Sequence, residues 1–149
     1  LYNLNTTGLR FFTVYGPWGR PDMAMYIFVK NILSGKRIPV YNNGNMERDF
    51  TYIDDIVDGI MLSINKNYFC EIFNLGNNTT YKLMEMINII ESNLKIKARI
   101  QFKGAQLGDV KKTYADIDYS IEKIGYKPSI SLAKGIPRFI KWFKDYSSI

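Results

Sequence analysis

Short runs of β-forming residues alternate with amphipathic helical segments along the 149-residue sequence. An alternation of this kind predicts an α/β fold, in which helices cover the faces of a mostly parallel sheet. The strand-forming runs are short, well separated and too few for a complete doubly wound sheet. We therefore expect the smaller lobe of a larger α/β protein, with one or two strands belonging to a sheet whose other strands lie outside these residues.

The pattern of apolar residues and turn residues places the individual elements. Asp54 and Asp55, Thr79 or Thr80, Asp116 and Ser131 precede or open helical patterns, so we expect them at helix N-termini. Asn42 to Asn45 form an Asn/Gly turn. We expect strands at residues 8–15, 38–41, 50–53, 70–75 and 97–102, and helices at 23–33, 54–64, 80–94, 116–124 and 131–146.

Composition excludes several kinds of chemistry. The sequence contains no His and one Cys, Cys70, which removes His-based catalytic triads and leaves few ligands for a metal site. A lone Cys also excludes an internal disulfide and is typical of the reducing cytoplasm. No apolar run is long enough to cross a bilayer, so we expect no membrane partner.

The charge is moderately basic, at +6, with a local row of cations at Lys134, Arg138 and Lys141. Such a row can form a patch for phosphate or nucleic acid, but charged helix faces more often serve solvation. We interpret this row as a solvated helix face and expect no nucleic-acid partner.

Of two motifs that are typical of nucleotide-dependent enzymes, one is absent from the sequence and the other occurs only as often as chance predicts. No Gly-rich turn between a strand and a helix is present to hold a dinucleotide pyrophosphate. Tyr-x-x-x-Lys occurs twice, at Tyr26/Lys30 and at Tyr119/Lys123, a frequency expected by chance in a chain with this many Tyr and Lys residues. We therefore assign no catalytic residue within this sequence.

The stretch Leu9–Arg20 reads LRFFTVYGPWGR and predicts a strand that enters a tight turn. It places the Thr13 hydroxyl and the Arg20 guanidinium seven residues apart around a chain reversal. Arg offers a two-pronged donor and Thr adds one more, so the loop could bind a carboxylate. The alternative is a core strand followed by a surface Arg.

Two long motifs, RFFTVYGPWGRPDMA from Arg10 and RDFTYIDDI from Arg48, resemble the extended short-chain dehydrogenase/reductases that act on nucleotide sugars. Weaker motifs follow in that family's order: NLGN at Asn74, LGD at Leu107, Tyr114-Ala-Asp, and WFKDY near the end. The chain is most similar to the UDP-glucuronate 4-epimerases. The resemblance implies the C-terminal, substrate-binding lobe of a Rossmann-type α/β enzyme. Residues 1–20 would then form the last strand region and active-site loop of the Rossmann part, and residues 21–149 a mixed α/β substrate lobe.

The resemblance also implies a role for individual residues. Thr13 and Arg20 match positions that hold the sugar carboxylate, and Arg48 matches the Arg that binds the diphosphate. Gln106 stands where galactose epimerases have Arg, which favours the glucuronate group. The other matches are Phe12 and Val14 beside the NAD cofactor, the backbone of Ala24 and Met25 near the diphosphate, Pro39, Val40 and Tyr41 around the uracil, and Asp109 near the ribose.

Other acidic residues have simpler interpretations than acid–base catalysis. We expect Asp49 in a turn, and Asp54 and Asp55 at a helix N-terminus. The resemblance implies a cytoplasmic NAD-dependent parent enzyme, a homodimer, whose catalytic Tyr and Lys lie upstream of this sequence. The chain alone would then be inactive. A 4,6-dehydratase or a UDP-glucuronate decarboxylase of the same family, or a non-catalytic UDP-sugar or nucleic-acid binding module, remain the alternatives.

Overall fold

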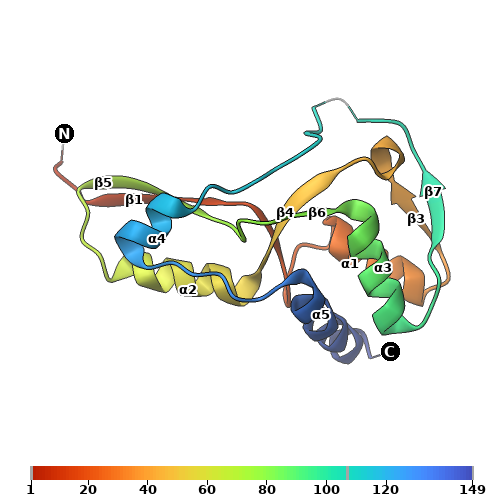
Figure 1. Cartoon of the computed structure of the whole chain (residues 1–149). Helices are drawn as coiled ribbons and strands as arrows, with labels where there is room; N and C mark the ends of the chain where they lie inside the picture. The colour runs from red at the N-terminus through yellow and green to blue at the C-terminus, as the bar shows by residue number, and fades with distance from the viewer. Residues whose placement is uncertain (1, 107, 149) are drawn as a thin grey trace.

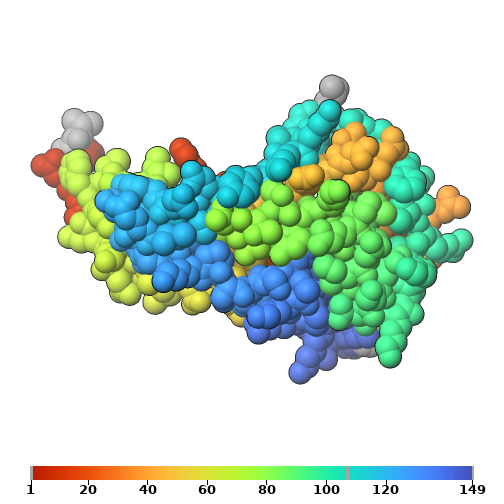
Figure 2. Space-filling model, viewed as in Figure 1, coloured from red at the N-terminus to blue at the C-terminus, as the bar shows by residue number. Residues whose placement is uncertain are grey.

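The computed structural model describes residues 2–106 and 108–148, which alternate strands and helices in an elongated molecule (Figures 1 and 2). Strands are β1 (Thr6–Phe11), β2 (Thr13–Tyr15), β3 (Arg37–Val40), β4 (Glu47–Tyr52), β5 (Cys70–Leu75), β6 (Thr80–Lys82) and β7 (Arg99–Phe102). Helices are α1 (Ala24–Leu33), the 3₁₀ turn η1 (Tyr41–Gly44), α2 (Ile53–Ile64), α3 (Leu83–Leu94), α4 (Asp118–Ile124) and α5 (Leu132–Ser147). No helix within the described ranges is both long and apolar enough to cross a membrane.

Among the described residues the strands form three small sheets. β1 pairs with β5 in parallel, β2 pairs with β4 in parallel while β6 joins β4 antiparallel, and β3 pairs with β7 in parallel. Parallel pairs need crossover connections, and the helices between the strands supply them. The expected α/β class is confirmed.

The buried side chains form two clusters, one at each end of the molecule. One lies between the β1–β5 sheet and helices α2 and α4 and centres on Phe73, Leu75 and Tyr126. The larger cluster joins α1, α3 and α5 to the other strands (Figure 1). Both clusters draw on segments from several parts of the sequence, and the domain division at residue 20 stays a prediction.

The strand expected over residues 8–15 is two strands in different sheets. Phe11 is the last residue of β1 to pair with β5, and the Phe12 N–H still donates to the Leu75 carbonyl at 3.2 Å. From Thr13 the chain pairs with β4 instead. The separation arises from long-range pairing, which the local run of β-formers does not reveal.

The N-terminus of α3 also differs from the expectation. Thr80 lies in β6 and pairs with Asp49 of β4, and α3 begins three residues later at Leu83. The prediction of a Thr cap was wrong because antiparallel pairing with β4 keeps Thr80 extended, and the N-cap residue of α3 is Lys82. α3 itself buries the expected face, with Leu83, Met86, Ile87, Ile90 and Leu94 in the core.

The acidic residues expected at the N-termini of α2 and α4 lie there, but the N-cap residues themselves are Tyr52 and Ile117. Asp54 and Asp55 lie inside the first turn of α2. The Asp55 carboxylate accepts hydrogen bonds from the N–H groups of Ser129 and Ile130, at 2.9 and 3.1 Å, and so attaches α2 to the segment before α5. Asp116 accepts from the Asp118 N–H at 3.1 Å, just outside α4.

One face of the β1–β5 sheet has no cover among the described residues. Ile72 is about half exposed there, although Phe73 on the opposite face is fully buried. Phe11, the last residue of β1, pairs with Leu75 on the covered face and is also about half exposed. On α2, Met61 and Ile64 are more than half exposed. Apolar side chains are thus exposed both on the open face of the sheet and on α2.

Candidate functional site: a sugar-nucleotide pocket

A cavity of about 350 Å³ lies between the N-terminus of α1, strand β4 and the 3₁₀ turn η1. It brings together six residues that the sequence assigned to substrate binding: Thr13, Ala24, Pro39, Tyr41, Arg48 and Asp109. These residues come from five separate segments. The fold therefore brings together residues that are far apart in the sequence and that only the resemblance to the family had linked.

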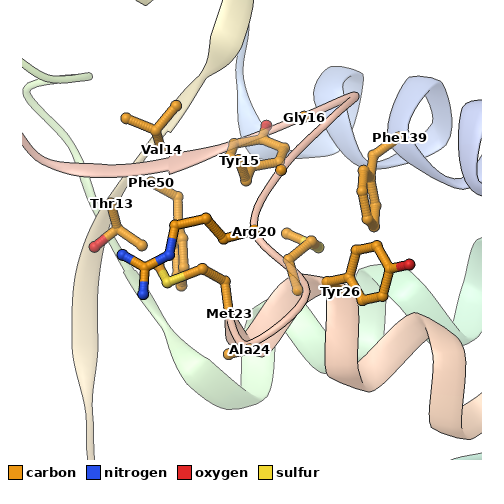
Figure 3. Close-up of a pocket in the computed structure, with 12 residues that line it drawn as sticks. Thr13, Val14, Tyr15, Gly16, Arg20, Met23, Ala24, Tyr26, Phe50 and Phe139 are labelled. Carbon is orange, nitrogen blue, oxygen red and sulfur yellow. The ribbon is translucent and has the colours of Figure 1, made fainter.

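Arg20 lines an adjacent cavity of about 40 Å³ that shares Thr13, Met23 and Ala24 with the first. Figure 3 shows the Arg20 guanidinium and the Thr13 hydroxyl on the same side of this cavity, away from Phe139. The two donors predicted to hold a carboxylate therefore line one space. The Arg20 side chain is also 75% exposed, as the surface-Arg alternative expected, and its role toward a carboxylate stays a prediction.

Strand pairing explains why Thr13 and Arg48 reach the same cavity. Thr13 pairs with Phe50 across the parallel β2–β4 ladder. Arg48 lies two residues before Phe50, and residues two apart on a strand share a face. The side chains of Arg48 and Phe50 therefore both face the pocket, next to Thr13.

Two hydrogen bonds fix the position of the Arg48 side chain. Its Nη2 donates to Asp109 Oδ1 at 2.6 Å and its Nη1 to the Glu47 carbonyl at 2.9 Å. The Arg48 side chain is 15% exposed and that of Asp109 31%. A guanidinium carries five N–H donors, so Arg48 keeps donors for an anionic ligand while its orientation is fixed.

The N-terminus of α1 forms part of the wall beside Ala24. Its N-cap is Met23, and in the described structure no side chain caps this end and no acidic residue lies in the first turn. Free N–H groups and the helix dipole favour an anion at such a terminus. The predicted backbone contact of Ala24 and Met25 with a diphosphate suits this geometry.

Tyr41 begins η1 at the far side of the cavity. The ammonium of Lys103 lies 5.4 Å from the centre of the Tyr41 ring, and the Lys103 N–H donates to the Val40 carbonyl at 2.8 Å. A cation over one ring face orients the ring by a cation–π contact. No sequence motif indicates Lys103, because only the β3–β7 pairing brings it next to Tyr41.

Three predicted residues have more limited access to the cavity. Met25 is 4% exposed and lines only the smaller cavity beside Arg20. Val40 is fully buried and lines neither cavity, so only its backbone is available to a ligand. Gln106 lines a smaller cavity of about 60 Å³ together with Asp109. Leu107, part of the predicted LGD motif, lies outside the described residues.

Phe12 and Val14, predicted to lie beside the cofactor, line a fourth cavity of about 360 Å³ together with Trp18, Arg20 and Ile53. Most of this lining is apolar, which fits a flat ring better than a charged pyrophosphate. The residues present can thus form one wall of a nicotinamide site, and the pyrophosphate would be held elsewhere.

Asp49 was expected in a turn, and that expectation was wrong. It lies in β4 with no exposed surface. Its carboxylate accepts from the N–H groups of Asn77 and Ala115, at 2.7 and 3.1 Å, and from the Thr51 hydroxyl at 3.1 Å. It therefore joins three segments directly beside Arg48. The sequence feature that could have indicated this buried role is an acidic residue within a run of strand-forming residues.

The tyrosines of the two Tyr-x-x-x-Lys matches are not placed as catalytic bases. Tyr119 donates to a Glu71 carboxylate oxygen at 2.8 Å, which raises the pKa of its hydroxyl. A catalytic base needs the opposite shift. Tyr26 packs edge-on against Phe143, with ring centroids 5.0 Å apart.

Comparison with known proteins identifies the family of this chain. A family model described as the NAD dependent epimerase/dehydratase family matches residues 1–76. The chain belongs to this family of NAD-dependent enzymes, and it has the fold of the C-terminal half of its extended members.

Its relatives and structural neighbours include UDP-glucuronate 4-epimerases, a UDP-glucose 4-epimerase and a dTDP-glucose 4,6-dehydratase. A UDP-glucuronate 4-epimerase of Arabidopsis thaliana (number 4) is 41% identical over 99% of this chain and 38% of its own length. An uncharacterized protein of Methanocaldococcus jannaschii is 56% identical over 97% of this chain and 44% of its own. The UDP-glucuronic acid 4-epimerase of Bacillus cereus, solved with UDP-glucuronic acid and NAD, superimposes with a TM-score of 0.88 at 34% identity. That match covers 93% of this chain and 45% of the other. The chain thus spans less than half the length of these relatives.

Proposed function

We propose that this chain is the sugar-nucleotide-binding half of an enzyme that interconverts UDP-glucuronate and UDP-galacturonate at C4. The observation that carries the proposal is the convergence of Thr13, Arg20 and Arg48, with the N-terminus of α1, on adjoining cavities. A UDP-uronate has two separate anionic groups, a diphosphate and a carboxylate. The pocket has two separate sets of donors.

Each set of donors suits one anionic group. Arg48 and the N–H groups of α1 would bind the diphosphate, because a fixed guanidinium and a helix N-terminus both favour phosphate oxygens. Thr13 and Arg20 would bind the carboxylate. Tyr41 offers a ring face for the uracil, and Asp109 offers an acceptor for ribose hydroxyls.

Holding the carboxylate has a chemical purpose in this reaction. NAD, when bound, supplies the hydride acceptor for oxidation at C4. Oxidation at C4 makes the sugar a β-keto acid, which loses CO₂ readily. Donors from Arg20 and Thr13 would keep the negative charge localised on the carboxylate, which opposes that loss while the sugar turns over.

The chain alone would not perform the reaction. Its residues include neither a Gly-rich pyrophosphate turn nor a suitably placed Tyr and Lys pair. Proximity of cofactor, base and sugar is what such catalysis requires. The exposed Phe11 and Ile72 on the β1–β5 sheet and Met61 on α2 are consistent with a cofactor-binding part packing there.

The test joins this chain to the cofactor-binding half of the Arabidopsis UDP-glucuronate 4-epimerase and supplies UDP-glucuronate and NAD. We expect UDP-galacturonate as the product, and none from the chain alone or from the chimera carrying Arg20→Ala. Release of CO₂ would indicate a decarboxylase, and loss of water a dehydratase. Binding of single-stranded DNA in preference to UDP would overturn the proposal altogether.

A further inference from the structure

The donors of Arg20 already hold a carboxylate from within the chain. Arg20 Nε donates to Asp22 Oδ1 at 3.1 Å, and Nη2 donates to Asp22 Oδ2 at 2.5 Å. This two-pronged geometry is the one by which an Arg binds a carboxylate ligand. Asp22 therefore occupies the donors that a uronate would need.

Asp22 is also part of the pocket. It lines the 350 Å³ cavity together with Thr13 and Arg48, whereas Arg20 lines the adjoining one. A ligand that fills the first cavity therefore meets Asp22 directly. The Arg20–Asp22 pair lies between the two spaces that the proposed substrate would span.

The Arg20–Asp22 ion pair is weak enough for a ligand carboxylate to replace Asp22 on Arg20. The Arg20 side chain is 75% exposed and that of Asp22 62%, and ion pairs this exposed contribute little to stability. The second ion pair of the pocket, Arg48–Asp109, is more buried. Arg20 also keeps the pKa of Asp22 below its usual value through their hydrogen bond, so Asp22 stays charged near neutral pH.

We propose that Asp22 is a displaceable internal carboxylate that competes with the sugar carboxylate for Arg20 and so determines specificity between uronates and neutral sugars. This inference rests on the proposed function. A neutral hexose leaves the Arg20–Asp22 pair intact. A uronate replaces Asp22 on the guanidinium, and its affinity is reduced by the cost of that exchange.

The experiment measures Kd for UDP-glucuronate and UDP-glucose by calorimetric titration of the whole chain and its Asp22→Asn variant. We expect Asp22→Asn to tighten UDP-glucuronate binding about fivefold, the scale of one exposed ion pair, and to leave UDP-glucose within about twofold. The matched control is Asp58→Asn, which makes the same charge change on the exposed side of α2. It should leave both affinities unchanged.

A second comparison separates competition from a general charge effect. In an Arg20→Ala background, Asp22→Asn should no longer tighten UDP-glucuronate binding. Equal tightening for both ligands, weaker UDP-glucuronate binding, or an effect that persists without Arg20 would each overturn the inference. If the folded wild-type chain binds neither UDP-sugar, the proposed function fails. If it binds them and Asp22→Asn changes nothing, only the role of Asp22 fails.

Discussion

The guanidinium of Arg48 on β4 lies 2.6 Å from the carboxylate of Asp109, 61 residues later in the chain. Both side chains line the 350 Å³ cavity, and the pair fixes Arg48 at its edge. Asp109 belongs to the segment that follows β7, so the site depends on a contact between distant parts of the sequence. The Arg that we assign to the diphosphate is thus oriented without the ligand.

Arg48→Lys tests whether the shape of the guanidinium matters as well as its charge. Lys keeps the charge and loses the planar donor fork, so we expect UDP to bind about tenfold more weakly, and Arg48→Ala to weaken it further. Calorimetric titration with UDP measures both. Full affinity in Arg48→Lys would show that only charge is required there.

Trp18 should affect carboxylate recognition through the loop that carries Arg20. Its backbone has a φ of 62°, in the left-handed region, and its ring contacts Trp142 and Tyr146 of α5 at centroid distances of 5.5 and 5.4 Å. We expect Trp18→Ala to loosen the loop and weaken UDP-glucuronate binding severalfold, with UDP unchanged. An equal loss for both ligands would mean that the whole pocket has been disturbed.

Asp49 should be important for stability. Removing a buried carboxylate with three hydrogen-bond donors leaves those donors unsatisfied, so Asp49→Ala should lower the free energy of unfolding by about 2–4 kcal/mol. Urea denaturation measures the loss, with the exposed Asp58→Asn as control. A loss below about 1 kcal/mol would contradict the role assigned to Asp49.

Glu91 should make stability depend on pH. Burial alone would raise its pKa, but hydrogen bonds from the Lys97 ammonium and the Ala98 N–H outweigh burial and lower the pKa below 4.5. A lowered folded-state pKa stabilises the protein above the unfolded value, and that stability is lost as pH falls through the folded one. Glu91→Gln should therefore reduce the loss of stability between pH 5 and pH 3, seen in urea midpoints. An unchanged slope would contradict this assignment.

Local signals predicted much of the fold. The amphipathic spacing on α3 and the Ser before α5 located those helices within a few residues, because their periodicity reflects the burial of one face. The break at Phe12 and the strand β6 were missed. Both depend on pairing with β4, and no local pattern encodes which distant strand a segment will join.

The candidate site shows the same contrast between residues that motifs predict and residues whose role depends on a distant contact. Family motifs indicated Thr13, Arg20 and Arg48 together, and the fold places them around adjoining cavities. Asp22 and Lys103 were overlooked, since their importance comes from a neighbour's donors or ring and not from a motif.

The most direct test of the central claim is a structure of this chain bound to UDP-glucuronate. We predict that the diphosphate lies between Arg48 and the N-terminus of α1, and that the carboxylate lies on Thr13 and Arg20 with Asp22 displaced. A sugar carboxylate placed away from Arg20, or a nucleotide bound outside the cavity of Thr13, Tyr41 and Arg48, would contradict it.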